Sequence, residues 1–575
     1  MCNPIKIEDL ILVCQKATTP WVKDTRELVL SQLEAVTALR PETVRDTDPV
    51  LDADRPEIIL GGTVRQEEKR VLETLAFNEY GVFIRGRKIV LAGWTPYTVR
   101  LAAQQFASNL SQYLVADADG VYFLDLQKVS EIKGVYEAYY GDLPVFEGEI
   151  QGVYDANDDC YSVWYKNVDA DGFAVYTKTV ESEGYRAVNR NSIGANSYAT
   201  YVKDGRKLHV YHIAKGRKLR IVYGPDDLIP ELMQPVTHKA AGHVVPSATI
   251  MPMQYVPAPG GGACMIFTLE DGTFFVIDGG WKEEAEVLYK TLRALNTDAN
   301  GADAPIVISA WFISHGHGDH TGCIYTFAPT YGDRVTVNAL IYNGVHDTQV
   351  CTSRVSRDIA LYRERVNEGI LAYFKDGNGN TPRVMKLHSG QKLCFGGAEI
   401  DVMYTHEDMF DVRVSNFNDF NTVLRLKLGG ETMMLASDAN SFELPSMIYE
   451  VGKEPLKANF VMVVHHAGDH SDMAYYQVVG AKYYFFPNSY EHYVWHTIDQ
   501  AKFQPWAEYV RVNATEIYLA DDWDPEYKTH NTCTTVYLPY TEGTYVEWNY
   551  ATERPSVRKA EGATHQPRPT VNEWL

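Results

Sequence analysis

The chain has 575 residues, of which 45% are hydrophobic and 22% are charged, and its formal net charge is −22. This composition is typical of a folded protein, and the length exceeds what one hydrophobic core supports, so several domains are expected. The excess of acidic residues excludes a polyanion-binding surface over the whole molecule, because phosphate backbones are bound by Lys and Arg.

The sequence carries no sign of export or of a membrane partner. No basic segment followed by an apolar one opens the chain, and no apolar run is long enough to span a bilayer. The eight cysteines are scattered without a C-x-x-C pair, which indicates reduced thiols rather than a disulfide framework. We therefore expect a cytoplasmic protein.

The first predicted domain, residues 1–130, is a small α/β module. Apolar spacing predicts a helix over 10–39, and Pro and Asp residues predict a linker over 40–56. The elements expected after it are a strand over 57–60, a helix over 66–77, a hairpin of 81–84 and 88–91, and a helix over 95–114. No ligand chemistry is visible here, so we interpret the module as accessory.

The second predicted domain, residues 131–240, is an α+β accessory module. Its expected elements are strands over 148–155 and 160–165, a helix over 169–183, and strands over 198–202, 207–214 and 218–223. Basic residues crowd its last hairpin at Lys207, Lys215, Arg217, Lys218 and Arg220. Either a solvated polar sheet face or a docking patch for an anionic partner would explain them.

The third predicted domain, residues 245–575, holds the candidate chemistry. Strands are predicted over 264–269 and 273–277, followed by a helix over 282–295. A β-rich segment at 306–313 comes next and leads directly into the most informative stretch of the chain. Within six residues that stretch places four side chains that commonly bind metals, which are His315, His317, Asp319 and His320.

This spacing predicts a metal site. A strand followed by a Gly-containing loop projects such side chains together from the carboxyl end of the strand. Imidazole nitrogens and carboxylate oxygens are the ligands that hold catalytic zinc and similar divalent ions. Four potential ligands at H-x-H-x-D-H spacing rarely arise from packing alone, so we favour a metal site over a structural His-rich turn.

The pattern resembles the metallo-β-lactamase superfamily, whose fold is a four-layer αββα sandwich with metals at one edge. The H-x-H-x-D-H stretch matches the superfamily motif residue for residue. Asp278, followed by two glycines, resembles the Asp that ends an early strand beneath the site. Asp438, after a predicted hairpin over 422–436, resembles the metal-bridging aspartate. His465 and His466, after a strand over 461–464, resemble the late strand-end histidine.

The resemblance implies two metal positions that share Asp438 as a bridging ligand. The ligands expected for them are His315 and His317 at the first, and Asp319, His320 and His466 at the second. Adjacent residues on a strand point to opposite faces, so only one of His465 and His466 should reach a metal, and the resemblance favours His466. Asp278 is expected behind the ligands, hydrogen-bonded to a ligating imidazole.

The tandem histidines and the segment 418–424 look most like the branch that includes the β-lactamase-like domain of DNA-uptake competence proteins. That branch has a polar, non-histidine residue at the position of Asn421, which we expect beside the ligands rather than among them. The superfamily often has a further histidine in mid-domain, and His406 is a weak candidate for that ligand. His496 lies where related branches place a histidine near the substrate, although a surface or capping role is as plausible.

The resemblance implies a metal-dependent hydrolase with two Zn²⁺ ions, and Mn²⁺ or Fe are alternatives. Such ions lower the pKa of a bound water, generate hydroxide at neutral pH and polarise a carbonyl or phosphoryl oxygen. Asp319 would also orient that hydroxide. Phosphodiesters or phosphoesters are slightly favoured over lactones, thioesters and amides.

Two other hypotheses remain open: a di-iron redox enzyme on the same fold, and a non-catalytic metal-binding protein. We expect a small-molecule substrate and no membrane partner. A nucleic acid is disfavoured by the net charge, with the basic hairpin at 207–220 as the possible exception.

Overall fold

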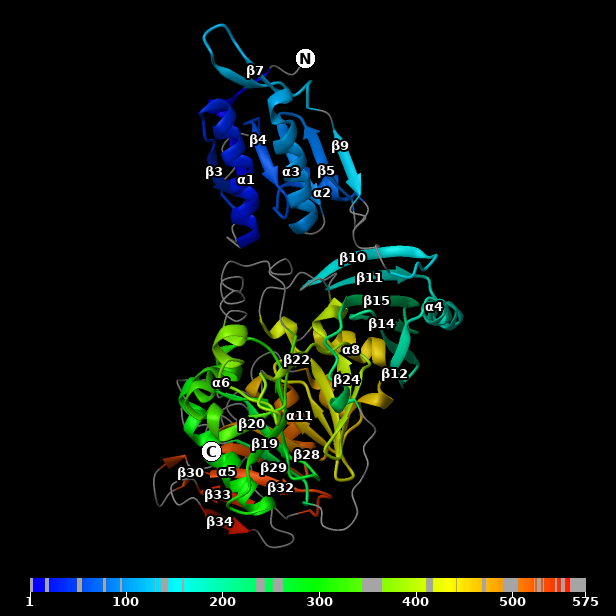
Figure 1. Ribbon diagram of the computed structural model, residues 1–575, viewed down its shortest axis with the longest axis vertical. Coiled ribbons are helices and arrows are strands. Elements are labelled where there is room, and N and C mark those ends of the chain that lie inside the picture. The colour runs from blue at the N-terminus through cyan, green and yellow to red at the C-terminus, as the bar shows by residue number, and fades with distance from the viewer. Residues whose placement is uncertain are drawn as a thin grey trace.

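The computed structural model describes residues 4–15, 20–48, 54–75, 79–93, 96–129, 131–135, 143–157, 160–233, 244–251, 262–343, 365–409, 417–440, 442–467, 472–489, 505–521, 523–524, 529–530, 532–542, 546–549 and 554–558. Figure 1 shows helices together with several separate sheets, so the chain is of mixed α/β class.

The N-terminal residues form a six-stranded sheet in the order β3-β2-β4-β6-β5-β9. Its strands are β2 (Ile11–Cys14), β3 (Glu42–Arg45), β4 (Glu57–Leu60), β5 (Glu79–Arg85), β6 (Lys88–Gly93) and β9 (Ile132–Val135). Helices α1 (Pro20–Thr37) and α3 (Pro96–Tyr113) pack against each other, and α2 (Gln66–Leu72) contacts β6. A small sheet joins β1 (Ile5–Lys6), β7 (Leu114–Ala116) and β8 (Tyr122–Leu124).

Two expectations for this region are wrong. The helix expected from residue 10 begins at Pro20, because the apolar run Ile11–Cys14 is a fully buried strand with parallel neighbours on both sides. A short apolar run of this kind has no period that separates a buried strand from a helix. The expected linker over 40–56 contains strand β3.

A second six-stranded sheet is entirely antiparallel, in the order β10-β11-β15-β14-β13-β12. Its strands are β10 (Glu149–Asn157), β11 (Cys160–Lys166), β12 (Arg186–Ile193), β13 (Asn196–Lys203), β14 (Arg206–Ile213) and β15 (Lys218–Pro225). Helix α4 (Ala170–Ser182) begins after Asp169, whose side chain accepts the Gly172 N–H at 3.0 Å.

The remaining chain folds around two sheets. The ten-stranded sheet contains β16 (Ser247–Ile250), β17 (Cys264–Thr268), β18 (Phe274–Asp278), β19 (Ile306–Ile313), β20 (Val335–Val337), β21 (Ala339–Tyr342), β22 (Arg383–Met385), β32 (Thr532–Tyr537), β33 (Val546–Asn549) and β34 (Arg554–Arg558). The seven-stranded sheet contains β23 (Lys392–Phe395), β24 (Ala398–Tyr404), β25 (Val423–Leu428), β26 (Glu431–Leu435), β27 (Phe460–Met462), β28 (Tyr483–Ser489) and β29 (Glu516–Asp521).

Alternating side chains explain why these two sheets stack. On β24, Val402 joins the core shared by the two sheets, whereas Met403 joins the cluster beneath helices on the opposite face. Met433 and Met434 divide in the same way on β26. A strand with one apolar residue for each face must be covered on both sides. Helices supply the outer cover: α5 (Ala285–Asn300) and α6 (Gly318–Tyr331) on the larger sheet, and α8 (Glu443–Val451), α9 (Met473–Val479) and α11 (Pro505–Asn513) on the smaller one.

The antiparallel sheet of residues 149–225 packs closely on this two-sheet region. Arg220 of β15 is fully buried, lies over the Trp164 ring at 4.1 Å and forms an ion pair with Asp408. A second ion pair joins Arg220 to Glu450 of α8 at 3.2 Å. Tyr211 donates its hydroxyl hydrogen bond to Asp408 at 2.9 Å. The interface is therefore part of the interior of the protein.

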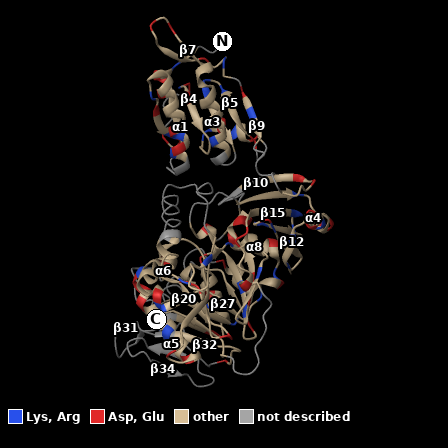
Figure 2. Cartoon of the chain, viewed as in Figure 1, with Lys and Arg blue, Asp and Glu red and all other residues tan. Residues whose placement is uncertain are grey.

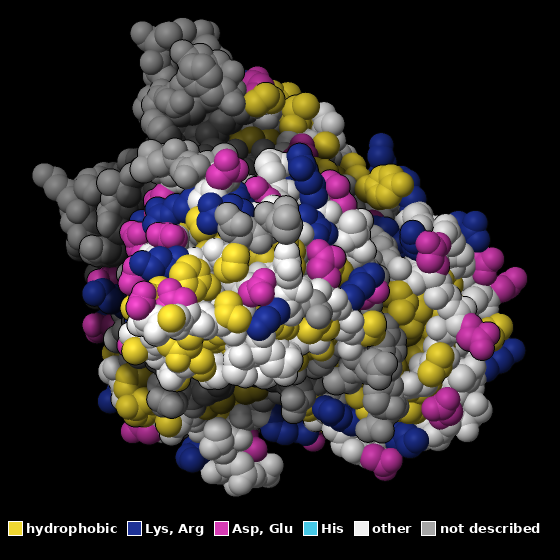
Figure 3. Space-filling model, turned by 90° about the horizontal axis from the view of Figure 1, so that it is seen from above, with side chains coloured by type: hydrophobic (Ala, Val, Ile, Leu, Met, Phe, Trp, Pro, Cys, Tyr) yellow, Lys and Arg dark blue, Asp and Glu magenta, His cyan; other side chains and the backbone are white. Residues whose placement is uncertain are grey.

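This packing corrects the interpretation of two of the five basic residues on the hairpin, whereas Lys215 and Arg217 are exposed. Lys207 and Arg220 are buried in ion pairs, with Asp227 for Lys207, so neither a solvated face nor a docking patch describes them. Figure 2 shows acidic and basic residues interspersed along the coloured elements, and the face seen in Figure 3 mixes them with hydrophobic side chains. Across the residues drawn in colour, the two views offer no continuous basic stripe.

Within the described part of the chain, no helix combines the length and the apolar composition that crossing a bilayer would require.

Candidate metal centre

Two neighbouring strands of the larger sheet deliver the first half of the site. Strands β18 and β19 are parallel, so their carboxyl ends lie at one edge of the sheet. Asp278 is the last residue of β18, and the motif loop begins directly after β19. Helix α6 then starts within the loop, which places Asp319 and His320 in its first turn.

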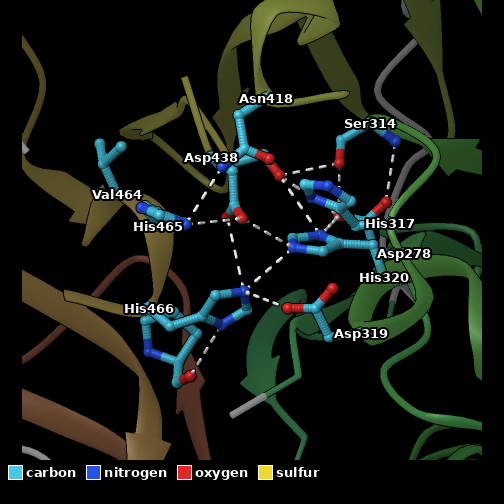
Figure 4. Close-up of polar contacts among 12 residues, drawn as sticks. Asp278, Ser314, His317, Asp319, His320, Asn418, Asp438, Val464, His465 and His466 are labelled. Carbon is cyan, nitrogen blue, oxygen red and sulfur yellow. Dashed lines mark hydrogen bonds and ion pairs between the residues drawn. The ribbon is translucent and has the colours of Figure 1, made fainter. Parts of the chain in front are cut away.

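The smaller sheet delivers the second half from its own strand ends. Strands β26 and β27 are also parallel; Asp438 follows the first, and the tandem histidines follow the second. Figure 4 shows these side chains and those of the motif loop pointing toward one another around Asp438. Four separate segments of the sequence therefore meet at one point.

The potential ligand atoms fall into two groups that share Asp438. In each group all ligand atoms lie within 4.8 Å of one another. The groups are His315, His317 and Asp438, and Asp319, His320, Asp438 and His466. In the first, His315 Nε2 lies 3.1 Å from His317 Nδ1. In the second, His320 Nε2 lies 3.0 Å from His466 Nε2 and 3.2 Å from Asp438 Oδ2.

The tandem histidines lie on a left-handed bend rather than on a strand. His465, His466 and Ala467 have φ angles of 52°, 48° and 67°. The expectation that His465 and His466 point to opposite faces of a strand is therefore wrong. Both approach the same carboxylate: His466 Nε2 lies 3.5 Å from Asp438 Oδ1, and His465 Nε2 lies 3.8 Å from Asp438 Oδ2. Only His466 belongs to a ligand group, as favoured from the sequence.

The electrostatics of the site favour neutral imidazoles in the first group. Burial and the neighbouring His320 hold the pKa of His315 well below its usual value, and burial lowers the pKa of His317. In the second group, burial lowers the pKa of His320 and of His466, but the nearby carboxylates, Asp438 foremost, together outweigh burial and the net shift of both pKa values is upward.

Several residues support the ligands from behind. Asp278 accepts hydrogen bonds from the backbone N–H of Ser314 at 2.8 Å and from His320 Nδ1 at 2.8 Å. Asn421 is buried and accepts the backbone N–H of Asp438 at 3.4 Å, while its own amide donates to the Asn418 carbonyl at 2.6 Å. Asn421 therefore lies beside the ligands, as expected.

Of the weaker sequence candidates, only His406 lies within the described residues. His406 is buried against the Phe420 ring, belongs to neither ligand group, and has its pKa lowered by burial to about 4. His496 lies outside the described residues, so its expected position near the substrate stays a prediction.

Sequence reasoning missed three polar residues at the site. Ser314 and Ser437 lie next to His315 and Asp438 in the chain, and their hydroxyl oxygens are 2.7 Å apart. Asn418 places its amide 3.1 Å from His465 Nε2. The only signal for the serines was their adjacency to candidate ligands, since a hydroxyl before a ligand is otherwise an ordinary residue at the end of a strand.

The residues present fit a pair of divalent cations. Asp438 Oδ1 is buried and accepts no hydrogen bond among the described residues, although four imidazole nitrogens approach its carboxylate. Facing imidazole nitrogens and a shared carboxylate form the donor set that zinc and other first-row ions prefer. Burial of so many convergent polar groups would otherwise be costly.

Comparisons with known proteins agree on the fold. Residues 257–390 match the family model described as the metallo-beta-lactamase superfamily, and this range includes the motif loop but not Asp438 or the tandem histidines. The chain therefore contains a domain of the metallo-β-lactamase fold. No curated protein matches the chain.

Solved structures show distant similarity. The metallo-β-lactamase fold protein YhfI from Bacillus subtilis is 15% identical, with 42% of this chain and 85% of that chain covered and a TM-score of 0.27. Zn²⁺-bound PqqB from Methylobacterium extorquens is 8% identical, with 38% and 71% covered and a TM-score of 0.24. A flavo di-iron protein mutant from Thermotoga maritima is 14% identical, with 44% and 62% covered and a TM-score of 0.21. No functional conclusion rests on these similarities.

Proposed function

We propose that this protein is a metal-dependent hydrolase that holds two divalent cations, with zinc as the first candidate. The observation that supports the proposal is the pair of ligand groups that share the buried carboxylate of Asp438. His315 and His317 would hold one ion, and Asp319, His320 and His466 the other. When bound, such ions lower the pKa of water and polarise the oxygen of a scissile bond.

The residues of the chain contribute orientation and charge. Burial alone would raise the pKa of Asp438, but the His320 and His466 imidazoles hold this pKa well below its usual value. Asp438 therefore stays ionised and offers both carboxylate oxygens. Asp319 is partly exposed on the first turn of α6, with its Oδ2 3.5 Å from His466 Nε2. We infer that Asp319 accepts a proton from the attacking water and orients it toward the substrate.

For the substrate, we propose a small phosphodiester or phosphoester ahead of lactones, thioesters and amides. The tandem histidines and the segment 418–424 resemble the competence-type branch, and a pair of cations attracts an anionic substrate to a protein whose net charge is −22. A nucleic acid is less favoured because Lys207 and Arg220 are buried.

The test combines elemental analysis with a hydrolysis panel. Purified protein should contain two zinc ions per chain and hydrolyse activated phosphodiesters, and a chelator should abolish both properties. Asp319→Ala should lower turnover by at least about 100-fold, the scale of a lost acid–base group, while the protein stays folded. Lys282→Ala, an exposed change beside the same helix, is the matched control.

Each result discriminates between the functions considered. Iron at two per chain would replace the hydrolase with a di-iron redox enzyme. Bound metal without turnover on phosphoesters, lactones, thioesters or amides would indicate a non-catalytic metal-binding protein. Unchanged turnover in Asp319→Ala would remove the proposed role of Asp319.

A further inference from the structure

We propose that the carboxylate of Asp278 fixes the tautomer of two histidines at once, directly for His320 and through the Ser314 hydroxyl for His315. The inference rests on the proposed function, because these two histidines belong to different ligand groups. One buried carboxylate would then orient a histidine in each of the two ligand groups. Ser314 is a positioning residue in this scheme.

The first link is direct. His320 Nδ1 lies 2.8 Å from Asp278 Oδ2, and both side chains are fully buried. A carboxylate only accepts hydrogen bonds, so Nδ1 must carry the proton in this contact. The other nitrogen, Nε2, is then the one left to face His466 and Asp438, on the metal side of the ring.

The second link follows from the single proton of the Ser314 hydroxyl. Its oxygen lies 2.7 Å from Asp278 Oδ2, 2.7 Å from Ser437 Oγ and 3.0 Å from His315 Nδ1. The proton goes to the carboxylate, the strongest acceptor of the three. Ser314 can then only accept from the other two, so His315 Nδ1 carries a proton and donates it to Ser314.

The geometry leaves His315 in the form that binds a metal. With Nδ1 protonated, Nε2 has a free lone pair, and Nε2 lies 3.1 Å from His317 Nδ1 on the metal side. The tautomer of a metal-binding histidine is usually set in this way by a partner on its other nitrogen. Here the carboxylate of Asp278 sets the tautomer of both the His315 and the His320 ring.

Burial and backbone conformation keep the arrangement in place. Asp278, Ser314, His315, His320 and Ser437 are each no more than 4% exposed, so water does not compete for these hydrogen bonds. Asp278 and Ser437 have φ angles of 57° and 45°, conformations that L-residues rarely adopt. Such backbone positions persist where surrounding contacts determine them.

The first measurement is zinc affinity, by competition with a chromophoric chelator. Ser314→Ala should weaken one of the two ions by about 10-fold to 100-fold and leave the other unchanged. Asp278→Asn should weaken both, because an amide donates where the carboxylate accepted. Ser314→Thr, which keeps the hydroxyl, should restore binding. Ser309→Ala, on the strand that leads to Ser314 and bonded to Thr273, is the matched control.

The second measurement is the ring ¹⁵N spectrum of histidine-labelled, metal-free protein, assigned by His315→Gln and His320→Gln. Both rings should carry the proton on Nδ1, and Ser314→Ala should change His315 alone. An Nδ1 without a proton on either ring, or equal weakening of both ions in Ser314→Ala, would overturn the inference. Wild-type protein that binds no zinc would instead overturn the proposed function, and the spectrum would still decide the tautomers.

Discussion

The two adjacent histidines, His465 and His466, differ in their contacts and in their exposure. His466 contacts His320, Asp319 and Asp438, whereas His465 contacts Asn418 and reaches Asp438 only at 3.8 Å. His465 is also the more exposed of the two, with 23% of its side chain accessible compared with 5%. The pair therefore offers an internal comparison between a buried ligand and a neighbour at the rim.

Replacing each histidine separately should separate these roles. His466→Ala should lose one of two zinc ions, because the second ligand group then lacks one of its two imidazoles. His465→Ala should retain both ions. Zinc per chain, measured after dialysis against a weak chelator, checks both results. Retention of both ions by His466→Ala, or loss of one by His465→Ala, would contradict the assignment.

Glu407 makes stability depend on pH away from the metal centre. Burial raises the pKa of this carboxyl to about 7, well above the usual 4.5. The folded state thus binds a proton that the unfolded chain has released. Its contribution to stability is fully present below about pH 4.5 and is lost as the pH rises to about 7.

Glu407→Gln should remove this loss. Between pH 5 and pH 8 the melting temperature of the wild type should fall relative to that of the variant. Glu454→Gln, an exposed carboxylate paired with Lys457, should follow the wild type and serves as the control. Parallel curves for the wild type and Glu407→Gln over this range would show that Glu407 is already ionised in the folded protein.

At the scale of elements, glycine turns fix how the sheets meet. Gly390 precedes β23 with φ +82°, and a Cβ there would lie 1.8 Å from the Tyr198 ring. Asn191 of β12 donates to the Gly390 carbonyl at 3.2 Å. The turn therefore makes contact with two strands of the antiparallel sheet at once.

Gly390→Ala should destabilise the protein well beyond the backbone cost of a left-handed alanine. Gly430, in the β25–β26 turn, has φ +86° and open space around it, so Gly430→Ala carries the backbone cost alone, about 1 kcal/mol. The difference in unfolding free energy between the two variants isolates the clash with Tyr198. Equal destabilisation would mean that the ring moves aside without cost.

Elements with clear periodicity could be predicted from the sequence, and the others could not. The β25–β26 hairpin was expected because apolar runs flank Gly429 and Gly430, and the structure has it there. Strand β12 was missed because its side chains are mostly polar. Asn189 and Asn191 on it bond backbone carbonyls of the neighbouring sheet region rather than filling a core. Contacts of that kind leave no period in the sequence.

The candidate site likewise has parts that could be predicted from the sequence and parts that could not. The motif at 315–320 could be predicted because its ligands lie within one loop, and local spacing records that. The bend at 465–467 could not, since none of its three residues is a glycine and only their surroundings hold them at positive φ. The hydrogen bonds of Ser437 join strand ends of different sheets, which adjacency in the chain does not reveal.

Across the whole molecule, the antiparallel sheet and the two-sheet region of the candidate metal site share one interior. Tyr198, Tyr211 and Val222 pack in the same hydrophobic cluster as Met447 and Val479. The predicted boundary near residue 240 therefore crosses a continuous core. The division of the chain into three domains stays a prediction.

Arg220→Met should test how strongly the two regions depend on each other. The change leaves Asp408 buried without its cation, while Glu450 keeps Lys218 at 2.8 Å, and loss of one partner from a buried ion pair costs about 3–5 kcal/mol. Arg217→Met, whose side chain is 59% exposed, should change the unfolding free energy by less than about 1 kcal/mol. Urea unfolding measures both, and similar values would mean that Arg220 adds no stability at this interface.

The bend at His465 and His466 has a consequence for protein engineering. Grafting the same two histidines onto the flat end of another strand would send one imidazole to each side of the sheet. A functional graft would have to include the left-handed backbone conformation of residues 465–467, together with the packing that stabilises it. The backbone conformation of the bend is therefore what a graft must reproduce, and the two histidines alone are not sufficient.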